Sequence, residues 1–170
     1  MNEELIKELL TACIQKFEEN TRKLITCLNE LDETDTWKRP NESSNSIGNL
    51  ILHLCGNIRQ YVISSLGHLP DVRERDEEFS AAGGCSKHEL TNKLTSTVDE
   101  AVNIISNATA EELLRKRQVQ GYFHSGIHIM VHVTEHYSYH TGQIIFWTKL
   151  LKNKDLGFYA GINLNTRNQQ

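Results

Sequence analysis

The sequence has few of the features that mark secreted, membrane or fibrous proteins. Its 170 residues include only two prolines and four cysteines, and no Cys-x-x-Cys pair occurs. No apolar run approaches the roughly 20 residues that cross a membrane, and the acidic, amphipathic start lacks the basic and apolar regions of a signal peptide. We therefore predict a cytoplasmic protein without membrane association. Its cysteines are expected to be reduced and buried as small apolar residues: Cys13, Cys27, Cys55 and Cys85.

Positive charge is also scarce. The chain has 18 Lys and Arg against 22 Asp and Glu, a formal net charge of -4. Such a chain has no positive field to hold a phosphate backbone, so we predict no nucleic-acid partner and a small-molecule substrate instead. The one basic cluster, RKRQ at residues 115–118, is interpreted as a solvated helix end.

Helical spacing of apolar residues is the main pattern present. It predicts four long helices, over about residues 2–31, 46–66, 86–107 and 123–152. Ser46 or Asn45 is expected to cap the second helix, and Ser86 with Glu89 forms a capping box for the third. The polar stretches at residues 32–46 and 71–85 are predicted loops, and QVQGYF at residues 118–123 is a predicted connector. With no good strand, the chain is expected to be all-α: a single four-helix-bundle domain over residues 1–170, with an irregular tail from about residue 153. The long connections are compatible with a crossover arrangement.

The stretch GYFHSGIHIMVHVTEHYSYHTGQII, residues 121–145, holds five of the eight histidines of the chain, each four residues after the last. A four-residue step drifts by about 40° around a helix, so the five cannot share one face. The apolar face of this helix can be found independently from Ile129, Val133, Tyr137, Ile144, Trp147 and Leu151.

That apolar face includes His140, and His136 lies at its edge. His132 lies one step further out, and His124 and His128 point to the opposite side, where we predict a solvated face. Two histidines at i and i+4 on one face can offer two nitrogens to one metal ion. The alternative is that His136 and His140 are hydrogen-bonded core residues.

A third ligand would have to come from another helix. The candidates are His53, His68, His88 and many carboxylates, and helical geometry favours His53 without deciding the matter. No catalytic side chain stands out, and Glu135 is interpreted as a surface carboxylate.

Three further residues are candidates to contact a metal ligand or to line a pocket beside the metal. Asn57, one turn after His53, is either a surface amide or a partner of a ligand. His132 is either solvated or lines a pocket mouth. Tyr137 is either a core aromatic or a residue whose hydroxyl reaches a site beside His140.

The segments WKRPNESSNSIGNLILHLCGN and EHYSYHTGQI resemble the DinB-like superfamily, which includes YfiT-type metal-dependent hydrolases and thiol transferases. The run VHVTEHYSYHTGQI and the segment KDLGFY are similar to a branch of unknown function within it. The resemblance implies a four-helix bundle, often dimeric. It also implies one divalent ion held by His53, His136 and His140, with zinc or nickel expected and manganese or iron as alternatives.

Three functions follow from such a site. We expect a small-thiol-dependent S-transferase acting on an electrophile, because relatives in the superfamily include thiol-dependent enzymes. A hydrolase in which the metal activates water is one alternative. A non-catalytic, dimeric metal-binding or interaction protein is the other, and it would require a fourth ligand to close the site. Apolar residues off the core face predict a homodimer: Ile127, Val131, Ile145 and Phe146.

Overall fold

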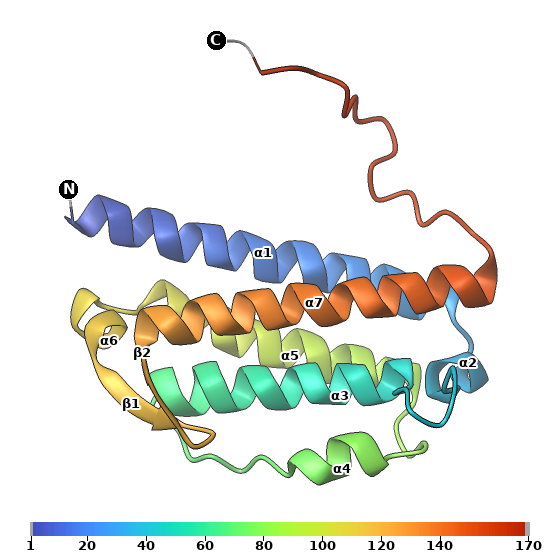
Figure 1. Cartoon of the computed structure of the whole chain (residues 1–170), viewed down its shortest axis with the longest axis horizontal. Coiled ribbons are helices and arrows are strands. Elements are labelled where there is room, and N and C mark those ends of the chain that lie inside the picture. Colours follow the sequence, from blue (N-terminus) through green and yellow to red (C-terminus); the bar gives the residue numbers. More distant parts are fainter. Residues whose placement is uncertain (1, 169–170) are drawn as a thin grey trace.

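The computed structural model describes residues 2–168 and has the predicted all-α architecture (Figure 1). The four long helices are α1 (Asn2–Glu30), α3 (Ile47–Ile58), α5 (Lys87–Ser106) and α7 (Gly126–Lys152). A π-helix, η1 (Arg59–Leu66), continues α3 to Gly67. The remaining elements are α2 (Glu33–Trp37), α4 (Arg75–Ser80), α6 (Ala110–Leu114), β1 (Lys116–Val119) and β2 (Tyr122–Ser125).

The four helices form two parallel pairs. Helix α1 packs against α5 and α7, and α3 packs against the same two helices. Figure 1 shows α1 and α7 running in one direction and α3 and α5 in the other. A parallel pair cannot be joined by a tight turn, so the chain crosses the length of the bundle between α3 and α5, and this crossover carries α4 (Figure 1). The crossover arrangement explains the long connections in the sequence.

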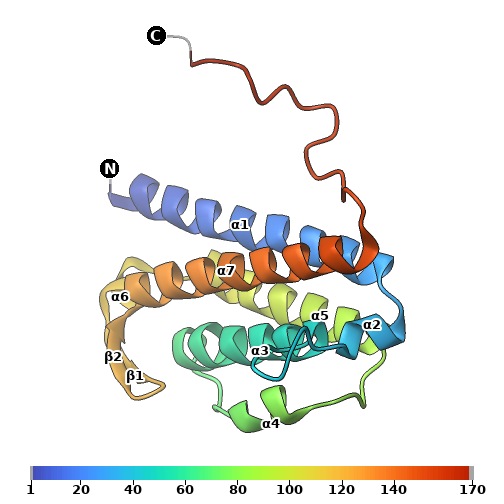
Figure 2. The ribbon, with the colours of Figure 1, turned by 45° about the vertical axis from the view of Figure 1, so that its right-hand side comes forward.

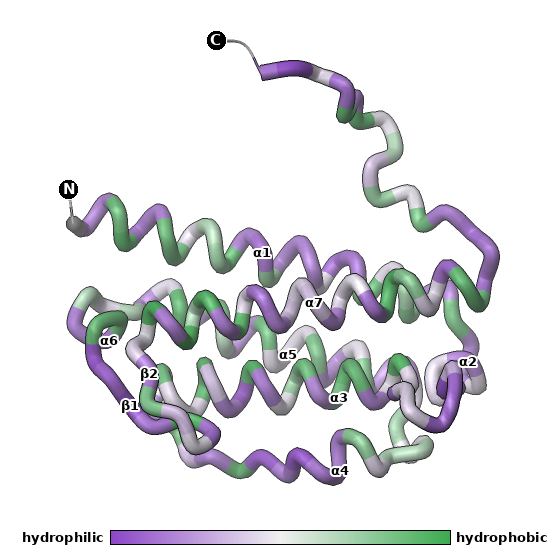
Figure 3. Tube along the Cα trace, viewed as in Figure 1, coloured by the Kyte–Doolittle hydropathy of each residue, from purple (hydrophilic) through white to green (hydrophobic). Residues whose placement is uncertain are grey.

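The core is built from the apolar stripes of the four helices. Fully buried side chains come from each of them, including Phe17, Leu54, Leu94 and Tyr137. The capping signals formed as predicted: Ser46 caps α3 in a capping box with Asn49, and Ser86 caps α5 with Glu89. In Figure 3 the apolar and polar residues alternate along α1 and α5, as amphipathic packing requires.

Two predicted loops contain short helices. The stretch at residues 32–46 holds α2, which Asp32 caps by accepting from the Asp35 amide. The stretch at residues 71–85 holds α4, whose residues are mostly charged and give no helical apolar stripe. Figure 3 shows this crossover as one of the most polar parts of the chain. Both helices are too short for hydrophobic periodicity to reveal them.

The predicted connector at residues 118–123 is instead part of a β-hairpin. Strand β1 pairs antiparallel with β2, with Val119 opposite Tyr122. The two turn residues, Gln120 and Gly121, have φ angles of 48° and 82°. Two central residues with positive φ suit the twist of a two-residue hairpin. The prediction that no strand occurs was therefore wrong, and α7 begins at Gly126 with Ser125 as its cap.

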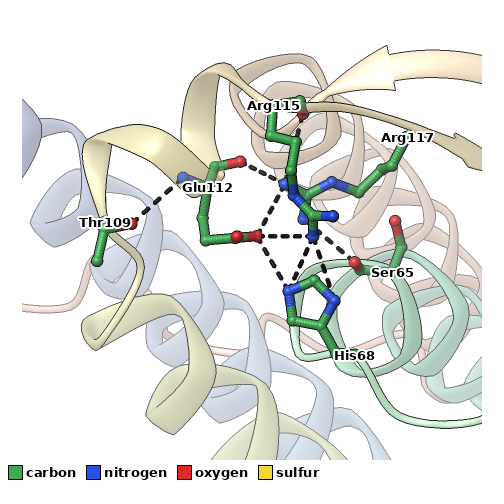
Figure 4. A network of polar contacts seen from close by, with 6 residues as sticks. All are labelled: Ser65, His68, Thr109, Glu112, Arg115 and Arg117. Carbon is green, nitrogen blue, oxygen red and sulfur yellow. Dashed lines mark hydrogen bonds and ion pairs between the residues drawn. The ribbon is translucent and has the colours of Figure 1, made fainter.

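The basic cluster at residues 115–118 is not a solvated helix end. Arg117 is 8% exposed, and its guanidinium donates to the carbonyl oxygens of Ser65 and Glu112 (Figure 4). Its Nη2 also lies 3.0 Å from Glu112 Oε2. Arg117 therefore joins β1 to the ends of η1 and α6.

The chain beyond Asn153 is irregular, as predicted. Leu156 and Phe158 pack against the core, and the following residues lead away from the bundle (Figure 2). The cysteines are free; Cys13, Cys27 and Cys55 are buried, and Cys85 is half-buried. None of the helices within residues 2–168 combines the length and the apolar character that a membrane crossing requires.

Candidate metal centre

The structure brings together the three histidines that the resemblance implied. His53 comes from α3, and His136 and His140 come from consecutive turns of α7. One ring nitrogen from each lies within 4.8 Å of the others. The Nε2 atoms of His53 and His136 are 3.1 Å apart. The ring of His140 lies 5.0 Å from that of His53 and 4.5 Å from that of His136.

The rotation of α7 is fixed by Tyr137, which lies between the two histidines in sequence. Its ring is fully buried against Phe17, and its hydroxyl lies 2.7 Å from the hydroxyl of Thr21 on α1. Since neighbouring residues differ by about 100°, anchoring Tyr137 toward α1 turns His136 and His140 toward α3. The Tyr137 hydroxyl is engaged in the core, so the structure gives it no contact with the site.

The three side chains fit a divalent ion. Nitrogens bound to one ion at about 2.0–2.1 Å lie about 3 Å apart at the usual bond angles, which is close to the separation of His53 and His136. Burial, helped by the neighbouring histidines, lowers the pKa of His136 to about 3. Burial also lowers the pKa of His140. Neutral imidazoles keep the lone pair that a metal needs.

No fourth ligand joins the group. Within residues 2–168, no carboxylate oxygen or cysteine sulfur belongs to the cluster of His53, His136 and His140. Three protein ligands leave coordination positions open for water or substrate. The group could therefore hold a metal in an open site.

Comparisons with known proteins identify the family and the fold of this chain. Residues 4–160 match a family described as a protein of unknown function (DUF1572). The chain belongs to this family. It is also similar to solved structures of a DinB-like protein from Bacillus subtilis and another from Bacillus cereus. A conserved protein from Enterococcus faecalis is similar as well. No curated protein matches.

The structural matches cover most of both chains at low sequence identity. The Bacillus subtilis protein is 14% identical, with 85% of this chain and 94% of that chain covered and a TM-score of 0.65. The Bacillus cereus protein is 14% identical, with 82% and 90% covered and a TM-score of 0.66. The Enterococcus faecalis protein is 19% identical, with 89% and 97% covered and a TM-score of 0.64. These likenesses confirm the DinB-like fold for this member of the family.

Sequence reasoning missed the hydrogen-bond partners of two of the three histidines, His53 and His140. Glu78 Oε2 lies 2.9 Å from His53 Nδ1, and Gln143 Oε1 lies 2.7 Å from His140 Nδ1. Arg73 donates to both oxygens of Glu78, at 2.7 and 2.8 Å. Burial opposes ionisation of Glu78, but the hydrogen bonds from Arg73 and His53 overcome it, so the pKa of the carboxyl lies below its usual value.

The other residues that were candidates to lie beside the metal ligands are buried or half-buried in the bundle. Asn57 is 3% exposed, so the interpretation as a surface amide was wrong, and its Oδ1 has no hydrogen-bond partner among the described residues. His132 is half-buried, and its ring lies 4.4 Å from that of Tyr61 in η1. Glu135 is exposed, as predicted.

The remaining histidines lie away from the triad formed by His53, His136 and His140. His68 contacts Glu112 and Arg115 at the end of η1 (Figure 4). His88 is exposed in the first turn of α5. His124 belongs to β2 rather than to the long helix, and its ring stacks on that of the exposed His128 at 3.8 Å. His124 is only half-buried, so both rings remain near the surface.

Proposed function

We propose that this protein is a metal-dependent enzyme that joins a small thiol to an electrophilic substrate. The observation that carries the proposal is the open group of His53, His136 and His140, which has no fourth side-chain ligand among residues 2–168. A structural zinc site is normally closed by four protein ligands. An open site supports catalysis over the alternative of a non-catalytic metal-binding protein.

The surroundings of the site favour a thiol over water as the nucleophile. When bound, a divalent ion deprotonates a thiol outright and lowers the pKa of water toward about 7. In zinc metalloproteases a glutamate beside the metal also serves as the general base for hydrolysis. Glu78 is the carboxylate next to His53, but Arg73 and His53 occupy both its oxygens. Glu135 is exposed on α7 and does not belong to the triad.

In this proposal the chain binds and orients the reactants. The imidazoles of His53, His136 and His140 would hold the ion through their lone pairs, and Phe79 covers the ring of His53 at 4.7 Å. The thiol sulfur forms a bond to the electrophilic carbon, the leaving group departs with its electron pair, and the thiol proton goes to solvent. Neither a redox partner nor a further base is required.

The test compares the two nucleophiles on the same protein loaded with zinc, nickel or manganese. Glutathione and cysteine would be offered chlorodinitrobenzene, with thioether formation followed by absorbance, and nitrophenyl acetate would be offered without thiol. We expect thioether formation that is lost in His140→Ala and kept in His128→Ala, an exposed histidine on the same helix. Ester hydrolysis without any thiol transfer would favour the hydrolase. Activity unaffected by His140→Ala would contradict a role for the triad.

A further inference from the structure

The crossover between α3 and α5 reaches the triad through one side chain. Glu78 lies in α4, 25 residues after His53, and is only 7% exposed. Its carboxylate sits so close to α3 that a Cβ added at Gly56 would lie 1.8 Å from Glu78 Oε1. Because Gly56 has no side chain, this carboxylate can approach the helix that carries His53.

Arg73 holds the Glu78 carboxylate in place. Its Nε donates to Oε1 at 2.7 Å and its Nη2 to Oε2 at 2.8 Å, a bidentate pair. The Arg73 side chain is 2% exposed, and its Nη1 donates to Gln60 Oε1 at 2.9 Å. A bidentate guanidinium keeps Glu78 ionised and leaves it able only to accept hydrogen bonds.

An ionised Glu78 determines which nitrogen of His53 carries the proton. Oε2 lies 2.9 Å from His53 Nδ1 and can only accept, so Nδ1 must be the donor. Arg73 Nη2 is also 3.1 Å from Nδ1, but two donors cannot bond each other, and Nη2 already donates to Glu78. The lone pair of His53 is then on Nε2, which faces His136 Nε2.

The crossover is fastened at this point by polar contacts. Asn49, fully buried in α3, donates to the carbonyl oxygens of Glu78 and Ala81 at 3.0 and 2.7 Å. A cleft of about 640 Å³ lies beside these contacts, with Gly56, Arg73 and Glu78 among its lining residues. Apolar packing therefore does not fill the space beneath the crossover, and the position of Glu78 depends on its own bonds.

We propose that Glu78, locked by Arg73, is the positioning residue that fixes His53 in its Nδ1–H form and aims its Nε2 at the metal. The inference rests on the proposed metal centre and adds α4 to it. Carboxylates that accept from a metal-binding histidine in this way orient the ring and raise its basicity.

The test measures the His53 tautomer and the zinc affinity separately. In metal-free protein, long-range nitrogen–proton NMR correlations should show His53 protonated at Nδ1. In Glu78→Gln the tautomer should become mixed. Zinc affinity, measured by competition with a chromogenic chelator, should fall by about 10–100-fold. Glu77→Gln, an exposed neighbour in α4, is the matched control and should leave both unchanged.

Two further variants separate positioning from loss of folding. Glu78→Gln/Arg73→Gln removes both charges, so no buried guanidinium is left unpaired, and it should bind zinc as weakly as Glu78→Gln. Gly56→Ala keeps Glu78 but displaces its carboxylate, and should also weaken zinc binding. Glu78→Asp keeps the charge and should restore part of the affinity.

The outcomes distinguish this inference from the proposed function. Wild-type protein that binds no zinc, nickel or manganese would overturn the metal centre itself. Wild-type protein that binds zinc, with equal affinity and the same His53 tautomer in Glu78→Gln, would overturn the positioning role and leave the metal centre intact.

Discussion

Tyr137 is the residue through which the core determines the orientation of the site. Its hydroxyl lies 2.7 Å from Thr21 Oγ1, which in turn donates to the Phe17 carbonyl oxygen. Because the Thr21 hydrogen is used in that bond, the Tyr137 hydroxyl must be the donor of the pair. The residue therefore acts through packing against α1, while its neighbour His136 faces α3.

We expect Tyr137→Phe to lower the free energy of unfolding by about 1 kcal/mol, the usual contribution of one buried hydrogen bond. Urea denaturation measures this, with Tyr139→Phe as a control because Tyr139 is 60% exposed. Zinc affinity should not change. Unaltered stability together with weakened zinc binding would show that the hydroxyl serves the site instead.

The four cysteines should react at very different rates. Burial raises the pKa of Cys55 to about 12 and that of Cys27 to about 11, and it also raises the pKa of Cys13. Thiolates are the reactive form, so only the half-buried Cys85 should react quickly with Ellman's reagent in the native protein. The fast phase should disappear in Cys85→Ala. A second fast thiol would mean that the core opens more readily than its packing indicates.

At the scale of elements, the hairpin is joined to the bundle by Arg117 (Figure 4). We expect Arg117→Ala to destabilise the protein by about 3 kcal/mol, because two carbonyl groups and Glu112 lose a buried charged partner. Arg115→Ala should cost less than about 1 kcal/mol, since the Arg115 side chain is 43% exposed. Urea denaturation of both variants gives the comparison. Equal losses of stability in the two variants would show that Arg117 is not the main link between the hairpin and the bundle.

The elements that the sequence predicted are those with a long apolar period. The four long helices and the inward direction of His136 and His140 follow from spacing, and the Ser46 and Ser86 caps follow from residue type. The hairpin could not be predicted in this way, because its strands have four residues each. Its turn residue Gln120 also adopts a positive φ, which is not expected of glutamine.

The contact of Glu78 with His53 could not be predicted from spacing for a different reason. It is one of several acidic residues in RERDEEF, and no local pattern separates it from its exposed neighbours Glu74, Asp76 and Glu77. Only the path of the crossover brings it to His53. A glycine opposite a buried carboxylate, such as Gly56, is a signal that becomes readable once the fold is known.

At the scale of the whole molecule, the outer face of α7 carries exposed apolar side chains among polar ones such as His128 and Glu135. Val131 is 57% exposed and Phe146 is 68% exposed, while Ile127 is 38% exposed. Ile145 packs against the core instead and does not belong to this face. We propose that the face is covered by a second copy of the chain, because exposed apolar side chains gathered on one face mark interaction surfaces.

Light scattering coupled to size-exclusion chromatography should therefore give the mass of a dimer at micromolar concentration. Phe146→Glu should shift it to a monomer, because a charge would be buried at the interface. Leu114→Glu, at an equally exposed leucine on α6, is the control and should leave the dimer intact. A wild-type protein with the mass of a monomer would contradict the proposed dimer.

The metal content of the protein tests the central claim most directly. Inductively coupled plasma mass spectrometry would be applied to untagged wild type, to His53→Ala, His136→Ala and His140→Ala, and to His128→Ala as the exposed control on the same helix. We expect about one divalent ion per chain in the wild type and the control, lost from each of the three variants. Wild-type protein that stays metal-free after incubation with zinc, nickel or manganese would contradict the metal centre. The three histidines would then be hydrogen-bonding residues of the bundle core.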